Sequence, residues 1–176
     1  TDLDIEGYSK PSPLMSSVCE VGGTAKRILS VGAYTTRNEY QLYRETVVNK
    51  LEQETVGAIS TFSGMGPTAD LRMKPEVAAP GCIIISAVSN YDSSSNRLVA
   101  KSYGGGSRYH LYGYMQGTSM AAPFVTGTVA AWLQAYPELS PEDLREVVAA
   151  TARLDDFTGD ATQAESQGFG YGKIDA

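Results

Sequence analysis

The sequence of 176 residues predicts an α/β fold with a mainly parallel sheet. Residues 28–34 and 82–88 are short apolar runs between turn residues, as expected of buried strands in a parallel sheet. From Thr118 onward the apolar residues change to a helical period, and the last helix carries clear capping signals. Short buried strands combined with capped helices favour the α/β class.

The remaining elements follow in chain order. Residues 1–24 hold two prolines and a glycine pair and are interpreted as mostly loop, and the polar residues 35–55 predict an excursion on the surface. A second short strand is expected at residues 57–61. Residues 77–81 end in a Pro-Gly dipeptide, which predicts a turn, so that the strand at 82–88 would begin just after it.

Two helices are expected in the last third of the chain. The first begins near Thr118 and ends before Pro137. Its inward residues recur at intervals of three and four: Ala122, Val125, Val129, Leu133 and Tyr136.

The second helix is signalled by its start. Ser140 is a good N-cap, Pro141 suits the first helical position, and Asp143 lies in the capping-box position. Leu144, Val147 and Val148 are expected to face inward, and the helix should run to about Ala152.

Composition excludes several classes of function. The net charge of −6 and the pI near 4.8 argue against nucleic-acid binding, which needs a basic face. No apolar run approaches the roughly 18 residues of a membrane helix. The sequence starts at Thr1, and within these residues we expect neither an initiator methionine nor a signal peptide. No repeat or linker divides it, so residues 1–176 are interpreted as part of a single domain.

Cys19 and Cys82 lie 63 positions apart, a spacing that fits no zinc or redox motif. They could form a disulfide in an oxidising compartment or remain two buried, unpaired thiols. We favour the two unpaired thiols.

Ser119 is the strongest candidate for chemistry. It lies in residues 117–123, where a loop meets a long helix. Backbone N–H groups at a helix start can stabilise the negative oxygen of an acyl-transfer intermediate, and Gly117 lets a substrate carbonyl approach the backbone. The alternative is that Ser119 only caps the helix.

The segment Gly-Thr-Ser-Met-Ala-Ala-Pro at 117–123 resembles the nucleophile signature of the subtilisin-like serine proteases (subtilases). Four further segments resemble family motifs in the same order: ILSVGA at 28–33, STFSGMGPT at 60–68, KPEVAAPG at 74–81 and GYGKIDA at 170–176. The resemblance implies that Ser119 is the nucleophile and that Gly117, Thr118 and Met120 lie at the oxyanion and substrate-binding site. Oxidation of Met120 would then crowd that site.

The sequence departs from the family in the residues that would activate Ser119. In subtilases the catalytic aspartate, histidine and oxyanion asparagine all precede the strand that begins here at Ile28. Residues 1–27 contain neither histidine nor asparagine, and the only histidine is His110. We therefore expect a C-terminal portion of a serine endopeptidase domain, inactive alone because an unassisted hydroxyl is a weak nucleophile. The alternative is a pseudoprotease or interaction domain.

The resemblance carries further expectations. It implies a three-layer α/β sandwich, a polypeptide substrate, and as partner the remaining N-terminal part of the catalytic domain. An isolated fragment would expose sheet edges, so a homodimer is also expected. Family members often bind calcium, but no cofactor is evident here, and Asp155, Asp156 and Asp160 are interpreted as a solvated loop. The family also implies secretion, the periplasm or the cell surface.

Overall fold

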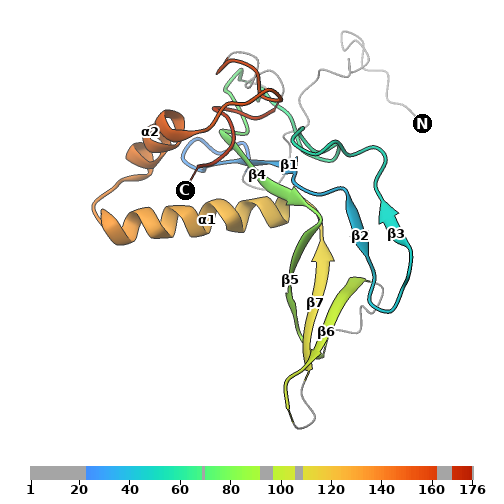
Figure 1. Cartoon of the computed structure of the whole chain (residues 1–176). Coiled ribbons are helices and arrows are strands. Elements are labelled where there is room, and N and C mark those ends of the chain that lie inside the picture. Colours follow the sequence, from blue (N-terminus) through green and yellow to red (C-terminus); the bar gives the residue numbers. More distant parts are fainter. Residues whose placement is uncertain (1–22, 69, 92–96, 106–108, 162–167, 176) are drawn as a thin grey trace, which may run out of the picture.

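The computed structural model describes residues 23–68, 70–91, 97–105, 109–161 and 168–175 (Figure 1). Within these ranges the chain forms three small sheets and two helices, in agreement with the α/β class. Neither of these helices is long and apolar enough to cross a membrane.

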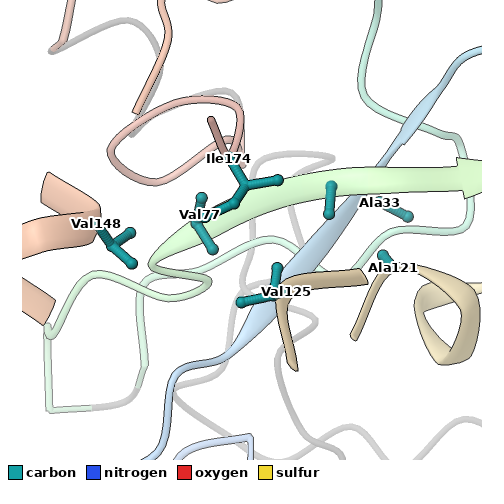
Figure 2. Close-up of a cluster of buried hydrophobic side chains, with 7 residues drawn as sticks. Ala33, Val77, Ala121, Val125, Val148 and Ile174 are labelled. Carbon is teal, nitrogen blue, oxygen red and sulfur yellow. The ribbon is translucent and has the colours of Figure 1, made fainter. Parts of the chain in front are cut away.

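The core lies where a parallel pair of strands meets both helices. Strand β1 (Val31–Thr35) pairs in parallel with β4 (Val77–Cys82), and helix α1 (Thr118–Ala135) packs against both strands. Figure 2 shows the buried side chains converging from β1, β4, both helices and the C-terminal segment. The cluster consists of Ala33, Val77, Ala79, Ala121, Val125, Val148 and Ile174, with Leu29, Val31, Val129 and Trp132 packed against it.

The strand expected at 28–34 is confirmed as β1, whereas two neighbouring expectations were wrong. Residues 57–61 form no strand and contribute a single bridge between Tyr34 and Ile59. The turn expected at 80–81 is instead part of β4. Strand geometry explains this, because Ala78 donates to the carbonyl of Gly172 on the side away from β1, and Pro80 shares that orientation. Its missing N–H therefore costs the β1–β4 ladder no hydrogen bond.

A second sheet projects from the end of β4 (Figure 1). It is antiparallel, with β5 (Ile84–Val88) and β6 (Leu98–Tyr103) on either side of β7 (Tyr109–Met115). Ile83, at φ 50°, separates β4 from β5, so the apolar run 82–88 is divided between two sheets. Among the described residues, parallel pairing is limited to β1 with β4 and to one isolated bridge between Ala78 and Lys173.

The surface excursion at 35–55 contains a small antiparallel hairpin of β2 (Glu39–Gln41) and β3 (Val48–Lys50). The β2–β3 region contacts the second sheet. The rings of Tyr40 and Tyr114 lie 4.2 Å apart between centroids, and the N–H of Tyr43 donates to the carbonyl of Leu98 at 2.7 Å.

Both predicted helices are confirmed. Helix α2 (Pro141–Thr151) has the full capping box, in which Ser140 Oγ accepts from the Asp143 N–H and Asp143 accepts from the Ser140 N–H. It buries Leu144 and Val148.

The inward face of α1 is centred on Ala121, Val125 and Thr128. Ala122 and Tyr136, expected to face inward, are exposed. The helix carries no charged residue, although much of its outer surface faces solvent.

A buried lysine anchors the C-terminal segment. Lys173 is 2% exposed, and its ammonium donates to the carbonyl of Gly57 and to Asp155, both at 2.7 Å. It also lies 4.7–5.4 Å from the ring centroids of three aromatic residues: Tyr34, Phe157 and Phe169.

Candidate active site

Ser119 is the second residue of α1, and its side chain is exposed. The N-cap position belongs to Gly117, so the alternative in which Ser119 caps the helix is wrong. Thr118 and Met120 flank Ser119 in the first turn and are half-buried. The structure thus brings all four predicted site residues together at one helix start.

A backbone hydrogen bond fixes this helix start on the sheet. The N–H of Gly117 donates to the carbonyl of Gly81, near the end of β4, at 2.8 Å. The approach requires glycine at 81, because a Cβ there would lie 2.5 Å from Cβ of Ala33 and 3.0 Å from the Gly117 carbonyl oxygen. The nucleophile candidate is therefore held by the same strand that forms the core.

Gly117 itself is required by its backbone conformation. Its φ of 140° and ψ of 162° lie where residues with a side chain are strained. Space is not the constraint, since an added Cβ would meet nothing closer than the Ser119 nitrogen at 3.7 Å and the Met120 sulfur at 4.0 Å.

The first turn of α1 presents backbone donors that no hydrogen bond within the helix uses. Met120 N–H donates to the Gly117 carbonyl at 3.0 Å, whereas the N–H groups of Thr118 and Ser119 have no helix carbonyl four residues before them. Gly117 offers no side-chain cap, and no acidic residue lies in this turn. Ser119 therefore lies at a helix N-terminus whose partial positive charge no acidic residue of the first turn neutralises.

Pro123 removes one hydrogen bond from the start of the same helix. It is the sixth residue of α1, and the ring nitrogen cannot donate to the carbonyl of Ser119 four residues earlier. The peptide group after Ser119 consequently lacks the usual helical hydrogen bond to its oxygen.

No base lies beside Ser119 in the described part of the chain, where no side chain hydrogen-bonds its hydroxyl. His110 is near the start of β7, opposite Ser102 on β6. Met115 lies five residues further along the extended strand than His110, a distance of about 17 Å at the rise of a β-strand. An added Cβ on Gly104 would lie 2.7 Å from Nε2 of His110, so the imidazole packs at the far end of the sheet.

The ends of β1 and β4 also hold a buried polar cluster that the sequence did not reveal. The Glu54 carboxylate accepts hydrogen bonds from the Thr35 hydroxyl at 2.7 Å and from the Thr61 hydroxyl at 2.5 Å. The Thr35 hydroxyl also contacts Ser60 Oγ at 2.9 Å. Glu54 lies in a polar stretch whose sequence contains no signal for burial.

Cys82 is a buried free thiol beside this cluster. Burial, and secondly the charge of Glu54, raise the pKa of Cys82, which keeps the sulfur protonated and unreactive. Cys19 lies outside the described residues.

The calcium implied by the resemblance fits no group of side chains here. Among the described residues, no three histidine, cysteine or acidic side chains gather to hold a metal. Asp155 instead forms an ion pair with Lys173. We therefore assign no step to a metal ion.

Comparisons with a family model and with known proteins show what this chain is similar to. The family model described as "Subtilase family" matches residues 9–172. The minor extracellular protease Vpr of Bacillus subtilis is 32% identical over 98% of this chain and 19% of Vpr. Fervidolysin of Fervidobacterium pennivorans is 37% identical over 69% of this chain and 17% of its own length. An uncharacterized protein of Aquifex aeolicus, aq_aa18, is 34% identical over 76% of this chain and 54% of its own length. The chain thus spans about half of the Aquifex protein and a fifth or less of the other two.

Proposed function

Because this chain belongs to the subtilase family, a family of serine peptidases, we propose that it is the nucleophile-bearing part of a serine endopeptidase. The observation that carries the proposal is the placement of Ser119. Its hydroxyl is exposed at the start of a helix that is anchored to the core through Gly117 and Gly81. A serine in this position combines access for substrate with a rigid support.

In this proposal Ser119 Oγ attacks the scissile carbonyl carbon, the peptide C–N bond breaks and the amine half of the substrate leaves with a proton. Water then hydrolyses the acyl-enzyme that remains. The N–H of Ser119 donates to the developing oxyanion, and Thr118 supports this geometry. Gly117 lets the substrate carbonyl approach the backbone, and a sulfoxide at Met120 would crowd the same space.

The remaining catalytic groups come from polypeptide outside this chain. The proton of Ser119 needs a base, and the single histidine of the sequence lies at the far end of β7. We infer that a histidine, its orienting aspartate and an oxyanion asparagine are supplied by the N-terminal part of the catalytic domain. The relatives, all longer than this chain, support that inference. Without that part the chain should be inactive.

The outer surface of α1 supports the same arrangement. Ala122, Thr126 and Ala130 are exposed along a helix that has no charged residue. A helix that is apolar or small on every side is normally buried. We propose that the N-terminal part covers this face and completes a three-layer α/β sandwich. The substrate would be an extended polypeptide, bound largely by that part.

The extracellular relative supports one further element of the proposal. Vpr is named as an extracellular protease. We propose that the protein containing this chain also acts outside the cytoplasm, by secretion, in the periplasm or at the cell surface.

The test is covalent labelling with a fluorophosphonate, read by intact mass, on the longest form of the protein that can be expressed. We expect one adduct per molecule, lost in Ser119→Ala and retained in Ser102→Ala, which removes an exposed hydroxyl at the far sheet. Adduct formation that persists in Ser119→Ala would disprove the assignment.

The missing base supports a second candidate, a pseudoprotease or interaction domain with the subtilase fold. The two candidates differ in the coding sequence before residue 1. A histidine and an aspartate in subtilase motifs favour the enzyme. Their absence, together with no labelling of a folded protein, favours the interaction domain.

A further inference from the structure

Strand β5 presents an unprotected edge. In the three-stranded sheet the order is β5-β7-β6, so β5 pairs with β7 on one side and has no partner strand on the other among the described residues. The sequence Ile-Ile-Ser-Ala-Val contains no charge and no proline, and its register with β7 is uninterrupted. Proteins usually protect a free edge with one of these three features.

The opposite edge of the same sheet carries two such features and a covering contact. The register of β6 with β7 shifts between Leu98 and Ala100, and Lys101 lies within the strand. The N–H of Tyr43, from the β2–β3 region, donates to the carbonyl of Leu98. One edge of the sheet is therefore protected and the other is not, although both lie at the surface (Figure 1).

The side chains of β5 are also accessible. Ile85 is 41% exposed, Ser86 and Ala87 are exposed, and the flanking Ile84 and Val88 are half-buried. Across the sheet, Tyr112 lies opposite Ala87 and is also 41% exposed. The edge thus joins unpaired backbone groups with a small apolar surface, a combination that an added β-strand satisfies.

We propose that β5 is a homodimer interface, in which two copies of this chain pair their β5 strands in antiparallel orientation about a two-fold axis at Ser86. In that register Ile85 faces Ala87 of the second copy, and Ile84 faces Val88. The dimer would contain one continuous six-stranded sheet.

The second copy is favoured by self-complementarity. About this axis the apolar pairs Ile85–Ala87 and Ile84–Val88 each form twice, and only Ser86 faces its own symmetry mate, so a charge at position 86 would meet a like charge. The five residues of β5 carry none. They also offer no charge that would select a different partner.

The net charge of −6 on each copy gives the proposal a distinctive salt dependence. The two copies repel at long range, while the contact between the strands is uncharged. Salt screens the repulsion, with a Debye length of about 10 Å at 0.1 M and about 3 Å at 1 M. The dimer should therefore become tighter as salt concentration rises.

Sedimentation equilibrium from micromolar to near-millimolar protein tests the proposal. The decisive variant is Ser86→Lys, which places two ammonium groups opposite each other at the axis. Ser102→Lys on β6 is the matched control, with the same change at an exposed serine of the same sheet. We expect Ser86→Lys to raise the dimer dissociation constant about tenfold or more, and Ser102→Lys to leave it nearly unchanged.

Hydrogen exchange on the unmodified chain gives an independent measurement. The outward N–H groups of β5 should gain protection as protein concentration rises, while those at the outer edge of β6 should not. A chain that stays monomeric throughout the range, a dimer that survives Ser86→Lys, or equal weakening by both lysine variants would each overturn the proposal. Protection of β5 only on adding an unrelated extended peptide would identify a different occupant.

Discussion

Replacing Lys173 by methionine removes a buried charge while keeping most of the side-chain volume. The ammonium group donates to Gly57 and Asp155, and it lies among three aromatic rings. The variant leaves the Gly57 carbonyl without this donor and Asp155 without its counter-ion. We expect a marked loss of folding stability with the fold retained.

The size of the loss follows from these contacts. Breaking a buried ion pair by removing one partner costs about 3–5 kcal/mol. Here the Asp155 side chain is 29% exposed, so water can solvate the remaining carboxylate. Methionine also recovers about 0.3–1.5 kcal/mol through contacts between sulfur and the rings. The expected net loss is about 2–4 kcal/mol, a large part of a typical stability of 5–15 kcal/mol.

Urea denaturation followed by circular dichroism measures this loss. Lys101→Met is the matched control, because the Lys101 ammonium also lies over an aromatic ring, 3.7 Å from the centroid of Tyr109, but on a strand at the surface. It should cost less than about 1 kcal/mol. Equal losses in the two variants, or a loss below about 1 kcal/mol for Lys173→Met, would refute the reasoning.

The dependence on pH adds a second criterion. Burial opposes ionisation of Asp155, but hydrogen bonds from Lys173 and from two backbone N–H groups outweigh it and lower the pKa of Asp155. A lowered pKa in the folded state stabilises the protein above the unfolded value of about 3.9, and this contribution disappears as pH falls through the folded value. The difference between the natural chain and Lys173→Met should therefore be largest near neutral pH and shrink below about pH 4.

Two further predictions concern single residues. Gly117→Ala should slow labelling of Ser119 sharply and lower folding stability by about 1–3 kcal/mol, because Gly117 has a positive φ. Gly127→Ala, at a position on α1 with open space around it, should leave stability unchanged or raise it. Similar behaviour of the two variants in labelling and denaturation would contradict this. Hydrogen bonds from Arg72 and Thr68 lower the pKa of Asp70 to about 2, so its carboxyl should titrate near that pH by NMR and move toward 3.8 in Arg72→Gln. An unchanged midpoint in that variant would assign the shift to another cause.

Local signals explain what could be predicted from the sequence. The start of α2 depends on Ser140, Pro141 and Asp143, which are adjacent along the chain and act through fixed spacing. The start of α1 at Thr118 likewise lies within one short motif. The sequence therefore located the helix that carries Ser119, while the catalytic role of Ser119 stays a prediction.

Contacts between distant residues explain what was missed. Lys173 binds Gly57 across 116 positions, and Glu54 becomes buried only when Thr35 and Thr61 surround it. Residues 82–88 have the composition of a buried strand, yet most of this run forms an exposed edge, because apolar composition does not specify which side a neighbouring strand will occupy. Such features depend on tertiary partners that no local pattern identifies.

The chain contains a single tryptophan, Trp132, which packs half-buried against the core cluster near the end of α1 opposite Ser119. Its indole should fluoresce at shorter wavelength while α1 rests on the sheet and shift toward red when the helix detaches. The protein thus has a built-in optical probe on the same rigid helix as the proposed nucleophile. Emission of this one residue can report whether that helix is seated in variants of this chain, without an added label.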